Sequence, residues 1–278
     1  MTATSRRAVW VSYGALTVLS VVWLVPLATV AMTSLRPQGE IRAGWWHLRG
    51  ATFTLRNYGE AWRQGLSSFV VNSVIITLLS VTLTVTLGAL AAYGFSRLRF
   101  RFKQVSYFLL ITTMIVPVQL ILIPLLPWFR TLGFDQGGIG PYLGIALVHT
   151  AFGSGWAVFM LTSFMNELPD EVLEAARIDG AGHLDTFRRI VLPLALPGIV
   201  SFAIIDFIFV WNDLLLALTL LGRDFQPLTV GLANLQSPHL TQDDIVSAGA
   251  MMAILPPLAL FVLLNRYYVR GLFAGSNR

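Results

Sequence analysis

The chain has 278 residues, of which 19 are Lys or Arg, 14 are Asp or Glu and 12 % are charged. The charged share is about half that of an average soluble domain, the apolar share is 55 %, and the mean hydropathy is +0.70. These values exclude a disordered chain, a coiled coil and an ordinary soluble enzyme. The absence of cysteine from the sequence also excludes disulfide bonds, thiolate metal sites and cysteine nucleophiles.

The first apolar run, residues 8–35, carries no charged side chain. Arg6 and Arg7 before it resemble the basic start of a signal peptide, but the run is far longer than the ~7–15 residues of a signal-peptide core. We therefore predict that it is an uncleaved membrane span over about residues 10–34.

Further apolar runs predict five more spans, since about 20 apolar residues are needed to cross roughly 30 Å of hydrocarbon. The predicted fold class is all-α: a polytopic membrane protein with six transmembrane helices and a single transmembrane domain over residues 1–278. The five spans are expected at about 68–95, 105–129, 141–164, 197–221 and 246–268.

The basic residues predict the orientation, because Lys and Arg in short loops concentrate on the cytoplasmic side. Segment 96–104 carries four of them, and both termini are basic. This pattern puts both termini in the cytoplasm. Segment 35–67 disagrees, since it would carry five Arg on the outside; its three Trp residues suit a segment that lies on the outer membrane surface.

Segment 166–197, which we call the elbow, is expected to form two short helices rather than a plain connector. Pro169 is placed for the first turn of a helix, acidic residues follow it, and Arg177 lies near the helix end, as the helix dipole favours. Gly180 is the expected C-terminal stop. A second short helix would end at Pro193 and Pro197.

The two helices would form a helix-turn-helix parallel to the membrane. The small side chains of Ala175 and Ala176 would leave one side of the first helix without bulk, so that another protein could approach the backbone there. A solvated amphipathic loop between two spans is the alternative that these residues leave open.

The elbow also contains a long spaced motif: Glu174-Ala175-Ala176, three residues, Gly180, nine residues, then Ile190-x-Leu192-Pro193. It resembles the signature of permease subunits of bacterial ATP-binding-cassette (ABC) importers at every fixed position. Segments 69–73, 91–98 and 211–213 extend the resemblance to the smaller, six-span permease of maltose-type carbohydrate transporters. The similarity covers nearly the whole chain.

This resemblance implies a transport function and a set of partners. It implies a multi-pass protein of the bacterial cytoplasmic (inner) membrane that forms half of a sugar pathway with a second, homologous permease. A solute-binding protein would deliver the sugar from outside, and two copies of a cytoplasmic ATPase subunit would bind the elbow. This chain lacks the phosphate-binding loop G-x-x-x-x-G-K-[ST], so ATP and Mg would be bound by the ATPase subunits and this chain would bind no cofactor. The residues implied in coupling to the ATPase are Glu174, Ala175, Ala176, Arg177, Asp179 and Gly180.

Two acidic residues, Asp206 and Asp213, fall inside the predicted fifth span. An ionised side chain is costly in hydrocarbon, so both are expected to face the bundle interior or a cavity. Asn212 and Asp213 could offer hydrogen bonds to sugar hydroxyls along the translocation pathway. Internal polar bonds are the alternative for both carboxylates, and for Asn72 an interhelical hydrogen bond is preferred to a pathway role.

The outer loop 222–245 is long for a connector. The resemblance implies that its tip reaches into the binding protein, and a simple surface loop is the alternative. The tip residues would be Gly231, Leu232, Ala233, Asn234, Leu235, Gln236 and Ser237.

Three other functions are alternatives to a sugar permease. A membrane aspartyl hydrolase would need two carboxylates close enough to share a proton, which two residues separated by two turns of one helix cannot provide. A stand-alone secondary transporter would not need the elbow motif. A polyol or glycerol-phosphate importer remains the closest alternative. The spans contain acidic residues and no interior Arg or Lys, however, and this favours neutral sugars. No catalytic residue and no metal ligand is predicted.

Overall fold

The computed structural model describes residues 6–235 and 242–274, and helices are the only regular structure in this part of the chain. The chain divides into two compact units. Unit 1 contains residues 1–67 and 232–255, and unit 2 contains residues 68–231 and 256–278. All of the elbow belongs to unit 2.

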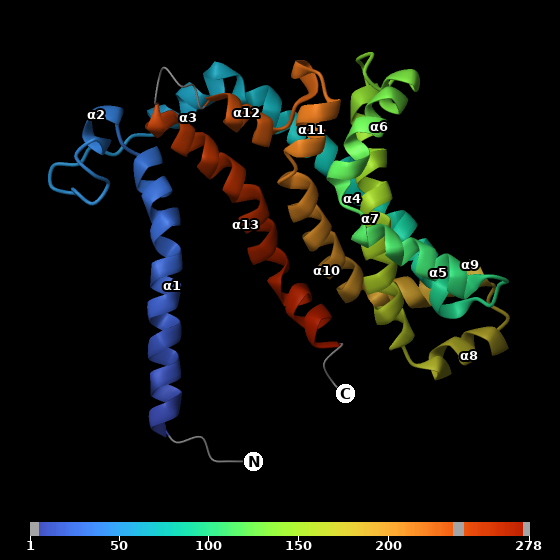
Figure 1. Cartoon of the computed structure of the whole chain (residues 1–278). Helices are drawn as coiled ribbons and strands as arrows, with labels where there is room; N and C mark the ends of the chain where they lie inside the picture. Colours follow the sequence, from blue (N-terminus) through green and yellow to red (C-terminus); the bar gives the residue numbers. More distant parts are fainter. Residues whose placement is uncertain (1–5, 236–241, 275–278) are drawn as a thin grey trace. The chain divides into compact units, whose positions relative to one another are not determined.

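Five helices are long and apolar enough to cross a membrane (Figure 1). A bent pair of helices passes the same test together, which gives up to six spans and agrees with the predicted fold class. The five long helices are α1 (Arg6–Ser34), α4 (Ser67–Arg97), α7 (Gly140–Asn166), α10 (Leu192–Trp211) and α13 (Asp243–Ala274).

The predicted third span is not one continuous helix. It is formed by α5 (Lys103–Thr112), the short turn η2 (Thr113–Ile115) and α6 (Val118–Thr131), with a bend of 100° at the break. Pro117 has no N–H to donate and disfavours a helical conformation in the residue before it. Val116 is accordingly extended, with φ −74° and ψ 117°.

The predicted fifth span, 197–221, is not one continuous helix either, so this prediction is wrong. Helix α10 ends at Trp211, and a second short helix, α11 (Leu215–Leu220), follows after a break. Asp213 therefore lies between two helices rather than two turns beyond Asp206 on one helix.

The elbow differs from the prediction at its second helix. Helix α9 (His183–Thr186) runs through a π turn, η3 (Phe187–Val191), directly into α10. Pro193 and Pro197 do not end it, because Pro193 occupies the first turn of α10 and the wider π turn precedes it.

In unit 1, the segment after α1 folds around the buried side chain of Arg36. Helices α2 (Gln38–Ile41) and α3 (Arg56–Ala61) and the π turn η1 (Trp62–Leu66) follow one another here. Arg36 pairs with Glu40 at 3.4 Å and donates a hydrogen bond to the carbonyl of Trp45. The backbone N–H of Thr52, together with Arg36, holds the pKa of the Glu40 carboxyl below its ordinary value.

These contacts explain part of the excess of Arg in segment 35–67, which disagreed with the predicted orientation. Arg36 is 2 % exposed and paired, and Arg63 pairs with Glu60 at 2.8 Å. Two of the five Arg of segment 35–67 are therefore engaged by carboxylates of the same segment.

Unit 2 has two apolar core clusters. One lies where α4, α7, the elbow and α10 meet, and includes Tyr93, Leu161, Leu173, Phe187 and Phe202. The other joins α6, α7 and α11 and includes Phe129, Ile145 and Leu216. In Figure 1 the elbow lies at one end of α7 and α11 lies at the other end.

Candidate functional site

The first helix of the elbow, α8 (Asp170–Ile178), begins one residue later than predicted, because Pro169, expected in its first turn, is the N-cap residue with φ −58° and ψ 131°. Its first turn carries Asp170 and Glu171 and its last turn carries Arg177, so both ends complement the helix dipole. Leu173 and Ala176 are each 5 % exposed, and Leu173 belongs to the core cluster of unit 2 and so attaches the helix to it. This attachment leaves the opposite face of α8 free.

Gly180 ends α8 as predicted. Its φ of +78° is a left-handed conformation that a side chain would strain. The backbone N–H of Gly180 donates to the carbonyl of Arg177 at 3.0 Å, and that of Ala181 donates to the carbonyl of Ala176 at 2.9 Å. These two bonds satisfy carbonyls at the helix end and fix the turn into α9.

The free face of α8 carries most of the predicted coupling residues. Glu174, Ala175, Arg177, Asp179 and Gly180 are exposed. Ala176 is buried, so the expectation that it lies open beside Ala175 is wrong. It is three residues from Leu173, which places both on the inward face of the helix.

Sequence reasoning missed the apolar part of this surface. Ile178 is 85 % exposed and Val172 is 41 % exposed. The signal was available, because α8 has a strongly one-sided core face and an apolar residue off that face has no partner in the chain's own core.

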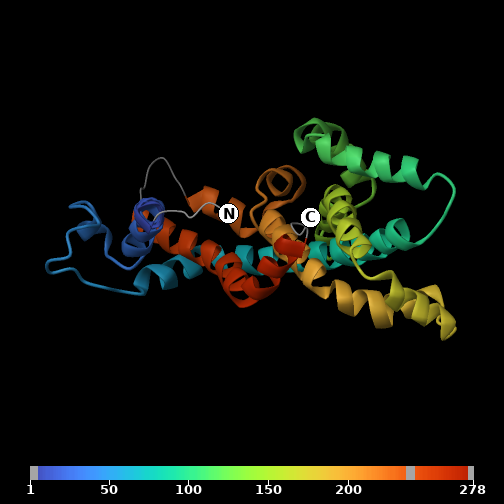
Figure 2. The same ribbon diagram turned by 90° about the horizontal axis from the view of Figure 1, so that it is seen from below.

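A large cavity with several charged lining residues lies beside the elbow. It has a volume of about 920 Å³ and is lined by residues from the end of α4, the following loop and α8. Figure 2 shows this loop and the elbow at the same end of unit 2. The charged lining residues are Arg97, Arg99, Lys103, Asp170, Glu174 and Arg177.

A second cavity, of about 380 Å³, lies in the middle of the spans of unit 2, beside both helix breaks. We call it the mid-span cavity. Thr113 and Val116 come from the first break, Asp206 and Phe209 from α10, and Asp213 from the second break. Asp206 is 5 % exposed, and its Oδ2 has no hydrogen-bond partner among the described residues.

Asp213 has a structural role as well as a place in the cavity wall. Its Oδ1 accepts a hydrogen bond from the backbone N–H of Leu216 at 3.2 Å, and its Oδ2 accepts one from Ala217 at 3.0 Å. These bonds satisfy the free N–H groups at the start of α11. His149, buried on α7, places its Nε2 3.7 Å from Oδ2 of Asp213.

The two predicted pathway amides do not line the mid-span cavity. Asn212 donates to the carbonyl of Ile208 at 2.7 Å. Asn72 donates to the carbonyls of Asp224 and Gln226, both at 2.9 Å, and accepts a bond from the hydroxyl of Tyr142 at 2.6 Å. The bond between Tyr142 of α7 and Asn72 of α4 is the interhelical hydrogen bond that we predict for Asn72.

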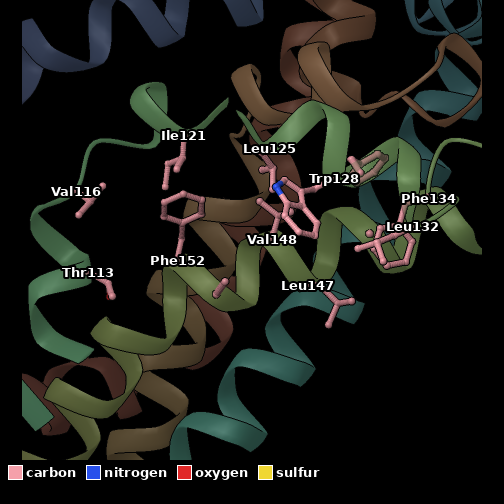
Figure 3. Close-up of a pocket in the computed structure, with 13 residues that line it drawn as sticks. Thr113, Val116, Ile121, Leu125, Trp128, Leu132, Phe134, Leu147, Val148 and Phe152 are labelled. Atoms are coloured by element: carbon pink, nitrogen blue, oxygen red, sulfur yellow. The ribbon is translucent and has the colours of Figure 1, made fainter. Parts of the chain in front are cut away.

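A third cavity, of about 490 Å³, lies between α6 and α7, and its lining is almost wholly apolar. Figure 3 shows Trp128 and Phe152 projecting into it. Its polar member, Thr113, already donates its hydroxyl to the carbonyl of Leu110 at 2.6 Å. The cavity therefore offers little to a hydroxylated solute, and the mid-span cavity is the better candidate for a polar one.

The predicted tip of the outer loop is helical where it is described. Gly231 to Leu235 belong to α12 (Leu228–Leu235), which follows the short turn η4 (Arg223–Phe225). Ala233 and Asn234 are exposed, whereas Gly231 is buried against Phe69. Gln236 and Ser237 lie outside the described residues.

Within the described ranges 6–235 and 242–274, no group of three or more His, Asp or Glu side chains could hold a metal ion. The elbow and the mid-span cavity are thus the two sites with chemistry to explain. The first presents exposed charged and apolar side chains, and the second offers carboxylates and aromatic rings inside the spans.

Comparisons with known proteins agree with this arrangement. The chain is 36 % identical over 271 residues to the osmoprotective compounds uptake permease protein GgtD of Synechocystis, covering 94 % of this chain and 90 % of that protein. It is 34 % identical to the melibiose/raffinose/stachyose import permease protein MelC of Bacillus subtilis, covering 91 % and 90 %. It is 33 % identical to the trehalose transport system permease protein SugB of Mycobacterium tuberculosis, covering 91 % and 92 %.

A solved structure has the same fold. A chain of a bacterial ABC transporter involved in the import of alginate superposes with a TM-score of 0.80 at 20 % identity, covering 96 % of this chain and 99 % of that one. The model of one protein family also matches residues 84–273, which is more than half of the sequence. The chain therefore belongs to the family of binding-protein-dependent transport system inner membrane components.

Proposed function

We propose that this chain forms half of the translocation pathway of a bacterial sugar importer. A second, homologous permease would supply the other half, and a solute-binding protein would deliver the sugar. Two separate ATPase subunits would bind ATP and Mg and drive transport. MelC and SugB, which are similar over nine-tenths of this chain, carry the names of oligosaccharide and disaccharide importers.

The observation that carries the coupling part of this proposal is the two-faced elbow helix. Leu173 attaches α8 to the core and Ala176 is buried, while Glu174, Ala175 and Ile178 are exposed. A short exposed helix with a fixed stop at Gly180 has the form of a protein-docking element. Exposed apolar residues beside a carboxylate suit a groove that contains a basic residue.

The core cluster offers a route by which movement of α8 reaches the spans. Leu173 packs in the same cluster as Tyr93 of α4, Leu161 of α7 and Phe202 of α10. Because packed cores resist compression, a displacement of α8 by an ATPase would shift the ends of these helices with it.

The mid-span cavity supports a neutral polyhydroxylated substrate. Asp206 and Asp213 supply hydrogen-bond acceptors, and Trp156 and Phe209 supply aromatic faces on which a sugar ring could pack. Among the described residues that line this cavity there is no Arg or Lys. A phosphorylated substrate would favour a cationic lining.

The outer partner is proposed from two observations. Ala233 and Asn234 are exposed on α12 in the segment where a binding protein would dock. A second structural neighbour, with a TM-score of 0.68 and 12 % identity, was solved in complex with an alginate pentasaccharide-bound periplasmic protein.

A charge reversal at Glu174 tests the coupling function. The complex would be reconstituted with its partner subunits and binding protein, and ATP hydrolysis and uptake measured with a panel of trehalose, melibiose, raffinose, sorbitol and glycerol 3-phosphate. Glu174→Lys should lower stimulated hydrolysis and uptake by at least about tenfold, within the range of coupling free energies. Assembly should persist, because Glu174 is exposed.

Glu171→Lys is the matched control, because Glu171 is an exposed carboxylate on the same helix outside the motif. It should keep most of the activity. Normal stimulated hydrolysis and uptake in Glu174→Lys would refute the assignment of α8 as the coupling element.

A second candidate substrate is favoured by one comparison. GgtD, at 36 % identity, is named for the uptake of osmoprotective compounds. If the substrate is of the polyol or glycerol-phosphate type, the wild-type complex should take up sorbitol or glycerol 3-phosphate in preference to the three sugars of the same panel.

A further inference from the structure

Arg97, in the last turn of α4, is a charged residue that the proposed mechanism has not used. Its side chain is only 12 % exposed. Its Nη1 pairs with Oδ1 of Asp170 at 2.6 Å. Its Nη2 donates to the carbonyls of Met165 and Leu168, the second at 3.0 Å.

The three partners of Arg97 lie at the joint between α7 and α8. Met165 is in the last turn of α7, Leu168 lies in the connection, and Asp170 is the first residue of α8. The last carbonyls of a helix have no partner within the helix. One guanidinium from α4 therefore satisfies carbonyls of the joint and holds the first residue of α8.

The chemistry of the joint requires arginine. A guanidinium presents several N–H donors in a fixed plane and can reach separate acceptors at once, whereas a lysine ammonium is a single point charge. A mostly buried cation is also costly unless it is paired, so its position is determined by these three acceptors together. Asp170 is 80 % exposed, so solvent screens its ion pair with Arg97 more than it would screen a buried pair.

We propose that Arg97 is a positioning residue that makes α8 move as one body with the ends of α4 and α7. This proposal rests on the coupling function proposed for α8. Without Arg97, α8 is held by the apolar contacts of Leu173 and by the short connection after α7. A force applied to α8 would then tilt this helix instead of moving the spans.

The first test measures sugar taken up per ATP hydrolysed in the reconstituted complex, with the panel sugar that the wild type transports best. Arg97→Ala should lower this ratio about tenfold, within the usual range of coupling free energies. Arg97→Lys should lower it less, because it keeps the charge and one bond. Arg101→Ala is the matched control, since Arg101 is exposed four residues away, lies in none of the cavities described above and should leave the ratio unchanged.

The second test measures the joint directly. Because the chain has no cysteine, spin labels can be attached at Leu90→Cys on α4 and Glu171→Cys on α8, both exposed positions. The distance distribution should be narrow and equal in the nucleotide-free and ATP-bound states of the wild type. In Arg97→Ala it should broaden and change with nucleotide.

An unchanged transport ratio with an unchanged label distribution in Arg97→Ala overturns the proposal. If Arg97→Ala does not assemble, Arg97→Lys decides by the same two measurements. Failure of the proposed function is a different outcome: there, the wild type itself would show no ATP-dependent uptake.

Discussion

The elbow and the mid-span cavity are assembled in opposite ways. The elbow surface comes from one short helix and its stop, residues 170 to 180, whose backbone conformation is stabilised by local hydrogen bonds. The mid-span cavity combines η2, α7, α10 and the break after α10. A local element can be altered at its surface without loss of the fold, whereas a cavity built from several helices depends on every contact between them.

The two regions also use their charges differently. The carboxylate of Glu174 is exposed and no hydrogen bond within the described chain involves it, so it is free for a partner. Asp213 already accepts two backbone hydrogen bonds, and Asp206 is buried. Substitutions in the elbow should therefore change coupling, and substitutions around the cavity should first change stability.

The largest expected effect is at Gly153, where α7 passes close to α4 and α10 beside the mid-span cavity. A Cβ at this position would lie 2.8 Å from Cγ2 of Thr84 and 3.1 Å from Oδ1 of Asp206. Gly153→Leu should cost more than about 3 kcal/mol of stability, because packed helices cannot admit the side chain. The yield of monodisperse protein in size-exclusion chromatography should fall sharply.

Gly94→Leu provides the control for this prediction. Gly94 is also in a helix, and a Cβ there would meet no atom within 4 Å. If both variants were equally well folded, the close packing around the cavity, and with it the contrast to the elbow, would be wrong.

The same contrast explains how far the sequence could predict the molecule. The stop of α8 at Gly180 follows from local backbone chemistry and is confirmed, and the start of α8 at Asp170 lies one residue beyond the predicted one. The breaks at Pro117 and after Trp211 were not predicted. Proline and polar residues inside a membrane helix are compatible with either a straight or a broken span, depending on which neighbours satisfy the freed backbone groups.

Individual residues show the same limit. Asp213 could be placed inside the membrane from the sequence, but its bonds to Leu216 and Ala217 exist only because α10 ends at Trp211. Arg97 was part of a recognised segment, yet its three partners are about 70 residues away in the chain (68, 71 and 73 positions). Contacts of this kind depend on how the helices pack and leave no local pattern.

A smaller effect, of about 1–2 kcal/mol, is expected when the side-chain cap of α11 is removed. Asp213→Ala removes the acceptors of the Leu216 and Ala217 N–H groups, so the apparent Tm of the purified protein should fall. Asp213→Asn keeps one carbonyl acceptor and should restore most of the loss.

This pair of variants also separates the two roles of Asp213 in uptake assays. If Asp213→Asn restores stability but not uptake, the carboxylate acts on the substrate as well as on the helix. Equal stability of Asp213→Ala and the wild type would show that the bonds to α11 contribute nothing.

The smallest effect on stability is expected in the elbow, where it should be accompanied by a larger effect on coupling. Gly180→Ser puts a side chain on a residue with φ of +78° and should cost about 1 kcal/mol. Because the strain falls on the turn that orients α8, ATP hydrolysis stimulated by the binding protein should decrease while the complex still assembles. Gly182→Ser is the control, since Gly182 has an extended conformation before α9, where serine is a favoured cap. If Gly180→Ser lost assembly while the remaining complex hydrolysed ATP normally, the substitution would act on stability and not on coupling. The elbow would then respond to substitution as the mid-span cavity does, and the distinction between the two regions would be lost.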